Sequence, residues 1–232
     1  MKAAVALNTT TVRLMTLSNV FLTGCDQNTQ WMLPWFVSEY KKHNITPLVF
    51  ADFGISKSLL QTAKDKKWFH EILPLHSDMS QGWFKKPKAM NKCGEKYKNT
   101  CWLDTDCQVV GNISGIFGHI EPGKLSMAED KPWSKRRGET WHNSGVVAFT
   151  GVPYILKQWM KLVRERPTVG DQETLHMMIP NPIMRMSMIL DLPNEYNVLR
   201  IQHEDGTVPN NPLIYHWTGK RGKDYIRGLI NE

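Results

Sequence analysis

Two patterns of apolar and polar residues follow one another along the first half of the chain. Runs of apolar and β-branched residues, which are typical of strands, occupy 12–23, 46–53, 69–75 and 100–103. Apolar residues at helical spacing, which predict helices, occupy 33–40, 56–67 and 87–97. Because strands and helices alternate, the sequence predicts an α/β fold with a largely parallel sheet.

The second half of the chain has a more mixed pattern. Strands are predicted at 124–128 and 144–149, and the segment 131–141 between them, rich in tryptophan and charge, is predicted to be a loop. A helix is predicted over 155–163, whereas three methionines alternate with polar residues at 184–188 and predict a half-buried strand. Since no linker or internal repeat is recognisable, a single domain is expected.

The chain is basic, with a formal net charge of +7. Its lysines and arginines form short clusters at 64–67, 85–88, 135–137 and 220–223. Such clusters suit phosphate-bearing ligands or an anionic membrane surface, although each is also compatible with a solvated loop. Nucleic acid is not an expected partner, because aromatic residues are not interleaved with the clusters in a stacking pattern and no nucleic-acid-binding motif is recognisable.

The cysteines and the N-terminal segment bear on the compartment. The four cysteines follow no zinc-binding spacing and are too sparse for a disulfide scaffold, so reduced thiols are expected. The short apolar run at 3–7 is interrupted by polar residues and makes a poor signal peptide, and no stretch reaches the length of a membrane span. We therefore expect a cytoplasmic protein whose basic clusters allow peripheral contact with a membrane.

Asp104 and Asp106 directly follow the predicted strand at 100–103. Side chains of an extended segment alternate between two sides, so both carboxylates can point the same way. Ligands of open α/β sheets bind beyond the carboxyl ends of the strands. Two carboxylates there suit a divalent cation, which would keep coordination positions open for diphosphate oxygens. A solvated turn is the alternative interpretation of so short a motif.

Further segments support the first interpretation, and in chain order they are NVFLTGCD (19–26), WFKKPKAM (83–90), WLDTDCQVV followed by ISGIF (102–117), HNSGVVAF (142–149), GDQETLH (170–176), LPNEYN (192–197) and YHWTGKRGK (215–223). Together they resemble the GT-A-fold glycosyltransferases, most closely the family-8 type that includes glycogenin and bacterial galactosyltransferases. The resemblance implies one GT-A-type (Rossmann-like) domain over 1–232, with a mixed, mostly parallel central sheet flanked by helices. Its nucleotide-binding half would be 1–106 and its acceptor- and sugar-binding half 107–232.

The resemblance also implies roles for individual residues. Asp104, Asp106 and His216 would hold Mn²⁺ or Mg²⁺. The donor-binding residues would be Thr23, Gly24, Asp26, Lys86, Thr105, Asn143, Gly219, Lys220 and Lys223. Asp130, Asp171 and Gln172 would act at the transferred sugar. The family has a lysine six residues after its histidine, where this chain has Gly222, so Lys220 and Lys223 are both candidates for that role.

Three of these residues also have simpler interpretations. Taken alone, Lys86 is compatible with an ordinary surface lysine and His216 with a structural histidine beside Trp217. Asp171 follows Gly170 and opens an apolar helix, so it is also compatible with a helix N-cap.

By this resemblance the chain is expected to be a metal-dependent glycosyltransferase that moves a hexose-type sugar from a UDP-sugar to a hydroxyl of a glycan, lipid-linked or protein acceptor. Family-8 enzymes retain anomeric configuration, which would make Gln172 the weak nucleophile, whereas inversion would need Asp171 or Glu173 as base. The alternatives are a basic nucleic-acid-binding protein and a sugar-phosphate nucleotidyltransferase of related fold. Residues 22–30, LTGCDQNTQ, lack the glycine-rich, arginine-containing phosphate loop that the nucleotidyltransferase would need.

Overall fold

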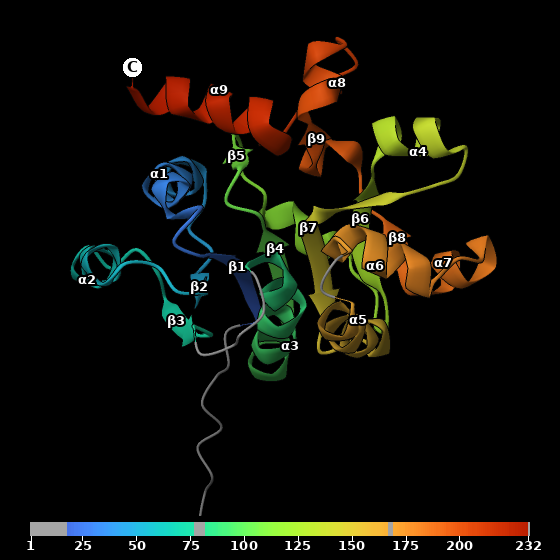
Figure 1. Ribbon diagram of the computed structural model, residues 1–232, viewed down its shortest axis with the longest axis horizontal. Helices are drawn as coiled ribbons and strands as arrows, with labels where there is room; N and C mark the ends of the chain where they lie inside the picture. The colour runs from blue at the N-terminus through green and yellow to red at the C-terminus, as the bar shows by residue number, and fades with distance from the viewer. Residues whose placement is uncertain (1–17, 77–81, 167–168, 232) are drawn as a thin grey trace, which may run out of the picture.

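A mixed sheet of seven strands forms the centre of the structure, a computed structural model that describes residues 18–76, 82–166 and 169–231 (Figure 1). The strand order is β3 (Glu71–Pro74), β2 (Leu48–Asp52), β1 (Asn19–Cys25), β4 (Asn99–Leu103), β7 (His142–Thr150), β6 (Leu125–Glu129) and β8 (Ile189–Asp191). β7 runs antiparallel to its neighbours β4 and β6, and the other four pairs are parallel. The predicted mixed, mostly parallel sheet is confirmed; the start of the first predicted strand, 12–17, lies outside the described residues.

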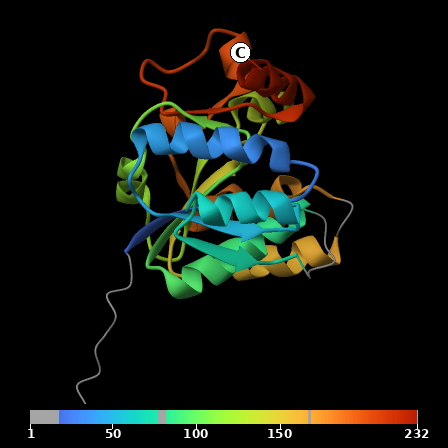
Figure 2. The same ribbon diagram turned by 90° about the vertical axis from the view of Figure 1, so that its left-hand side faces the viewer.

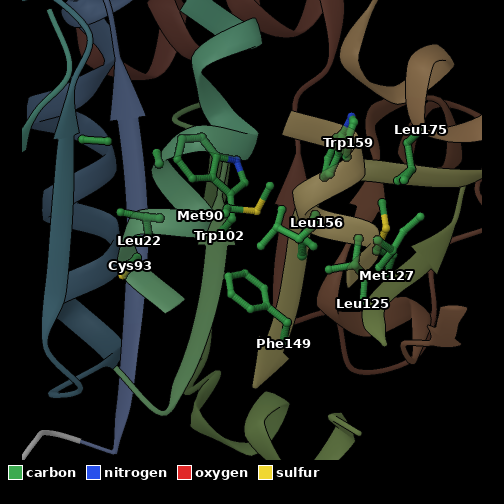
Figure 3. Close-up of a cluster of buried hydrophobic side chains, with 14 of the residues drawn as sticks. Leu22, Met90, Cys93, Trp102, Leu125, Met127, Phe149, Leu156, Trp159 and Leu175 are labelled. Atoms are coloured by element: carbon green, nitrogen blue, oxygen red, sulfur yellow. The ribbon is translucent and has the colours of Figure 1, made fainter. Parts of the chain in front are cut away.

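Helices cover both faces of this sheet (Figure 2). α1 (Leu33–His43) and α2 (Lys57–Asp65) pack on one face, and α3 (Lys86–Lys96), α5 (Tyr154–Glu165) and α6 (Asp171–Met178) pack on the other. Alternating side chains of each strand enter the two cores, so that in β4 Trp102 faces α3 and α5 while its neighbours face α1. Figure 3 shows the core on the α3 and α5 face, which contains Trp102, Met90, Leu156 and Trp159.

A second, three-stranded sheet brings the C-terminal part of the chain to the central sheet. β10 (Ile214–His216) pairs antiparallel with β5 (Cys107–Val109) and parallel with β9 (Val198–Leu199). His216 is thereby paired with Cys107, the residue after Asp106. α8 (Arg200–Glu204) and α9 (Gly219–Asn231) lie beside this small sheet, at the top of Figure 1. Short 3-10 helices occupy Gln30–Met32, Gly82–Lys85, Ser114–His119 and Asn194–Tyr196.

The prediction of a loop at 131–141 is wrong over most of its length, because α4 (Lys131–Arg137) forms there. The Asp130 side chain caps this helix by accepting a hydrogen bond from the Trp133 N–H at 3.1 Å, and proline follows in the first turn. Gly138, at φ 70°, ends the helix in the left-handed conformation. The N-cap at Asp130 and the glycine at position 138 are the local signals for a helix, and the high content of charged residues concealed them.

The prediction of a strand at 184–188 is also wrong, because this segment belongs to α7 (Pro182–Met188). Asn181 caps the helix by accepting from the Ile183 N–H at 2.8 Å. The alternating methionines do not line a buried face: Met184 and Met186 are exposed, whereas Arg185 between them is buried. Local capping therefore outweighs the apparent period of two. Within the described ranges, none of the helices has the length and apolarity that crossing a membrane requires.

Candidate active site

The residues expected to bind metal and donor converge at one edge of the central sheet. β1, β4 and β6 end at this edge, and β7 begins there because it runs antiparallel to β4 and β6. A cleft of about 920 Å³ opens along the edge. Of the expected site residues, those that line it are Gly24, Asp26, Lys86, Asp104, Thr105, Asp106, Asp130, Asn143, Asp171, Gln172, His216, Gly219 and Lys223. Thr23 and Lys220 do not line it.

The imidazole of His216 faces two carboxylates. Its Nε2 lies 3.2 Å from Asp106 Oδ1 and 3.8 Å from Asp104 Oδ2. Its Nδ1 lies 3.1 Å from the side-chain oxygens of Asn143 and Asn197, which only accept hydrogen bonds, so Nδ1 carries the proton. In the neutral ring, the Nε2 lone pair therefore points at anionic oxygens, an arrangement that a proton or a metal ion between them relieves. These two oxygen donors and one nitrogen donor fit Mn²⁺ or Mg²⁺.

The pKa values of these groups reflect their close contact. Burial alone would raise the pKa of Asp106, but His216 and Lys223 outweigh it and hold that pKa below its ordinary value. Burial disfavours the charged form of His216, yet the two carboxylates outweigh it and raise the histidine pKa. Cys107 also lies close to Asp106 and His216. Burial keeps the pKa of its thiol well above the ordinary value, so the thiol is protonated in the metal-free protein.

The backbone of β7 fixes the position of the histidine ring. A Cβ atom on Gly145 would lie 2.0 Å from His216 Cε1 and 2.5 Å from its Nδ1, so only glycine admits the ring here. The Gly145 carbonyl also accepts a hydrogen bond from the Asp104 N–H at 2.8 Å. One glycine thus sets the separation between a carboxylate on β4 and the imidazole on β10.

Lys86 lies at the centre of the site and is only 3 % exposed, so the interpretation as a surface lysine is wrong. Its ammonium group lies 3.1 Å from Asp104 Oδ1 and 2.9 Å from Asp171 Oδ2, and it donates to the Ser144 carbonyl at 3.1 Å. Burial disfavours its charge, but the two carboxylates outweigh that effect and raise its pKa. Lys86 therefore remains a fixed cation between β4 and α6.

Asp130, Asn143 and Gln172 form a hydrogen-bonded group next to His216, which Asn143 also contacts. Asp130 Oδ2 accepts from the side-chain amides of Asn143 and Gln172, both at 3.1 Å. The Gln172 carbonyl oxygen accepts in turn from Asn143 Nδ2 at 3.1 Å and from the Ser144 N–H at 3.2 Å. Each side chain is held by the others, which favours one preorganised arrangement.

The interpretation of Asp171 as an N-cap is wrong, because Gly170 occupies that position and Asp171 is the first residue of α6. Its carboxylate points into the site, where it accepts from Ser144 Oγ at 3.0 Å and pairs with Lys86. The Asp171 carbonyl also accepts from Trp159 Nε1 at 2.8 Å, which ties the start of α6 to the α5 core.

The two candidate lysines lie on different sides of α9, so only one of them reaches the cleft. Lys223 donates to Asp106 Oδ2 at 3.3 Å and lines the cleft. Lys220 points to solvent, 88 % exposed, and pairs with Asp224 at 2.6 Å. The family's lysine position falls on Gly222, whose Cβ would lie 2.0 Å from the Trp217 carbonyl oxygen, so no side chain fits there. Gly219, at φ 73°, turns the chain into the helix.

At the end of β1, Thr23 does not line the cleft, whereas Gly24 and Asp26 do. The Thr23 side chain is fully buried within the sheet, and its hydroxyl has no hydrogen-bond partner among the described residues. Asp26 lies on the cleft wall, where its Oδ1 accepts from the N–H groups of Asn28 and Thr29 at 3.0 and 3.1 Å. Gly24 is required for packing, since a Cβ there would lie 2.8 Å from the Ala51 carbonyl oxygen.

Several site residues were missed by sequence reasoning. Ser144 and Asn197 belong to segments that carry the family resemblance, so the signal was present but was assigned to their neighbours. Trp102 Nε1 donates to Asp104 Oδ1 at 2.6 Å, a contact that follows from the turn after β4. Arg136 and Trp133 line the cleft from α4, and the prediction of a loop concealed their fixed positions.

The chain has the GT-A fold of solved glycosyltransferases, although no family model and no curated protein sequence matches it. The apo form of the glycosyltransferase GlyE from Streptococcus pneumoniae TIGR4 aligns with a TM-score of 0.64 at 15 % identity, over 88 % of this chain and 55 % of that chain. The galactosyltransferase LgtC, in complex with donor and acceptor sugar analogs, gives 0.59 at 14 % identity, over 91 % and 95 %. Mouse xyloside xylosyltransferase 1 gives 0.55 at 12 % identity, over 86 % and 97 %. The chain spans about half the length of the GlyE chain (55 %), and these identities define the fold alone.

We predict that Gly145→Ala lowers the affinity for Mn²⁺ by at least about tenfold, because the new methyl group displaces the His216 ring. The measurement is a Mn²⁺ titration followed by electron paramagnetic resonance. Gly138→Ala is not a suitable comparison because of its positive φ, so Gly228→Ala, with open space around the added Cβ, serves as the control. Equal Mn²⁺ affinity in Gly145→Ala and Gly228→Ala would contradict the role of Gly145.

Proposed function

We propose that this chain is a metal-dependent glycosyltransferase that moves a hexose-type sugar from a UDP-sugar to a hydroxyl of a glycan, lipid-linked or protein acceptor, with retention of configuration. The observation that carries the proposal is the arrangement of the cleft. Asp104, Asp106 and His216 form a metal-fitting group, and a hydrogen-bonded carboxylate–amide group lies next to it, linked to His216 through Asn143. The GT-A fold supports this assignment.

The metal end of the cleft suits the diphosphate of the donor. Asp104, Asp106 and His216 would hold Mn²⁺ or Mg²⁺, which when bound neutralises the negative charge on the departing nucleoside diphosphate. Lys223 brings a second positive charge to the same end through its contact with Asp106. Lys86 and Trp102 both contact Asp104, so the carboxylate is already oriented before any ligand arrives. This preorganisation lowers the cost of binding a charged group.

The neighbouring carboxylate–amide group suits the transferred sugar. Asp130, Asn143 and Gln172 present carboxylate and amide groups that can exchange hydrogen bonds with sugar hydroxyls. Their mutual hydrogen bonds hold the three side chains in place, which suits the task of orienting the anomeric carbon toward an acceptor hydroxyl. The proposal therefore assigns the metal-fitting group to the leaving group and the carboxylate–amide group to the sugar.

Retention is the outcome that the surroundings of Asp171 and Gln172 favour. A general base on the inverting pathway needs a free carboxylate, and Asp171 is paired with Lys86 at 2.9 Å and with Ser144 Oγ at 3.0 Å. Gln172 offers a neutral carbonyl oxygen instead. We expect the product to keep the anomeric configuration of the donor, as read from proton coupling constants of the linkage. An inverted product would contradict retention and would make Glu173, which also lines the cleft, the candidate base.

We predict that Asp104→Ala and Asp106→Ala each reduce sugar transfer by roughly a hundredfold or more, because the metal contribution is worth several kcal/mol. Calorimetric titration of UDP, with and without Mn²⁺, measures the same effect without turnover, and wild-type protein is expected to bind UDP in preference to GDP. Asp205→Ala, an exposed aspartate outside the cleft, is the matched control. Mn²⁺-dependent UDP binding that survives in both cleft variants would overturn the metal assignment.

We predict that Lys223→Gln weakens UDP binding in the presence of Mn²⁺ by about tenfold, whereas Lys220→Gln leaves it within about twofold of wild type. The two lysines lie on the same helix, but only Lys223 reaches the cleft. Calorimetry on both variants at one ionic strength compares them directly. Equal losses would show that general positive charge, and not the Lys223 contact, attracts the nucleotide.

A further inference from the structure

The helix α4 carries four cations and lies at the edge of the cleft. They are Lys131, Lys135, Arg136 and Arg137, and within the described part of the chain none of them makes an ion pair with a carboxylate. Arg136 is exposed and also lines the cleft, together with Pro132 and Trp133 of the same helix. An unneutralised guanidinium group at the rim of a binding cleft attracts anions.

Trp133 orients the guanidinium groups of this helix. The Arg136 guanidinium carbon lies 4.8 Å and that of Arg137 lies 5.0 Å from the centre of the Trp133 ring. Stacking uses the face of a guanidinium group and leaves its N–H donors, which lie in the plane, free for a bidentate contact with phosphate or carboxylate. The tryptophan thus reduces the freedom that Arg136 must lose when it binds an anion.

The helix itself is fixed to the rest of the fold. Ser134 Oγ accepts from the Trp141 N–H at 2.9 Å, and the Trp141 ring stacks on His176 of α6 with ring centres 3.6 Å apart. The buried Arg185 of α7 donates to the Thr140 carbonyl. These contacts hold α4 at the end of the cleft as a formed element and not as a flexible loop.

α4 begins beside the group of side chains proposed to bind the sugar. Asp130 caps α4 and belongs to the group proposed to bind the sugar. It follows β6, which lies two strands from β4 in the sheet. The Asn143 side chain lies between Asp130 and His216, since it donates to Asp130 at 3.1 Å and its oxygen lies 3.1 Å from His216 Nδ1. An anion on Arg136 would therefore lie on the Asp130 side of Asn143, the side proposed for the sugar. Arg136 is exposed and also lines the cleft, so an anionic group that enters the cleft from solvent can reach it.

From this arrangement we infer that α4 recognises an anionic acceptor: Arg136, stacked on Trp133, binds a phosphate or carboxylate group that the acceptor carries near its reactive hydroxyl. Only the statement that the anion belongs to an acceptor rests on the proposed glycosyl transfer. The anion-binding role of Arg136 stands on the contacts of α4 alone. The metal- and donor-binding residues do not specify the chemical class of the acceptor, and the contacts of Arg136 point to an anionic one.

The test measures binding of glucose 6-phosphate, glucuronate and methyl glucoside to full-length protein saturated with UDP and Mn²⁺. Saturation keeps the charged probes out of the diphosphate end. Wild-type protein is expected to bind at least one charged sugar about tenfold more tightly than the neutral one, and the better of the two identifies phosphate or carboxylate. Arg136→Gln is expected to abolish that preference, and Arg136→Lys to keep part of it, since lysine retains the charge without the planar fork. Lys135→Gln, the same charge change on the same helix outside the cleft, is expected to keep all of it.

Two outcomes would overturn the inference. Equal affinity of wild-type protein for charged and neutral sugars would show that α4 does not select anions. A loss of UDP affinity in Arg136→Gln as large as the loss of sugar affinity would assign Arg136 to the donor. Absence of UDP binding by wild-type protein would instead contradict the proposed function, and the same three sugars titrated without UDP would still test anion binding by α4.

Discussion

The buried ammonium group of Lys86 is the interaction on which the cleft depends. It pairs with Asp104, which follows β4, and with Asp171, which begins α6, while it also contacts Ser144 on β7. Removing a buried cation from two carboxylates would leave charges uncompensated in a region with little water, which is strongly destabilising. Lys86 therefore joins three segments that the chain brings together from separate places, and it fixes the orientation of a carboxylate that would hold the metal.

A second constraint is the close approach of backbone to side chains, which sets distances that no side-chain rotation could adjust. Gly145 admits the His216 ring against β7, and Gly222 lets the start of α9 lie against the Trp217 carbonyl. Each glycine removes a Cβ atom that would collide with its neighbour. Gly145 determines how near the imidazole comes to the carboxylates. Because position 222 has no room for a side chain, the lysine of α9 that reaches Asp106 is Lys223.

Charge is distributed along the cleft in an order that matches the proposed chemistry. Asp104, Asp106, His216 and Lys223 lie at the end suited to a metal ion and a diphosphate. The neutral amides of Asn143 and Gln172 lie in the part suited to the sugar. Arg136 of α4 is exposed and also lines the cleft. Asn143 links the first two groups, because it contacts both Asp130 and His216.

The sequence by itself determined the alternation of strands and helices and the carboxylate pair after β4, because side-chain period and short motifs are local properties. Most of the site residues that the family resemblance implied line the cleft, although they make up fewer than half of its lining. It was misleading at α4 and α7, where capping by Asp130 and Asn181 outweighs composition and an apparent period of two. Only the tertiary structure decided that Lys86 is buried, that Thr23 is buried and does not line the cleft, and that Lys223 rather than Lys220 reaches Asp106. These outcomes depend on strand direction, helix phase and packing between segments far apart in the chain, which no local pattern contains.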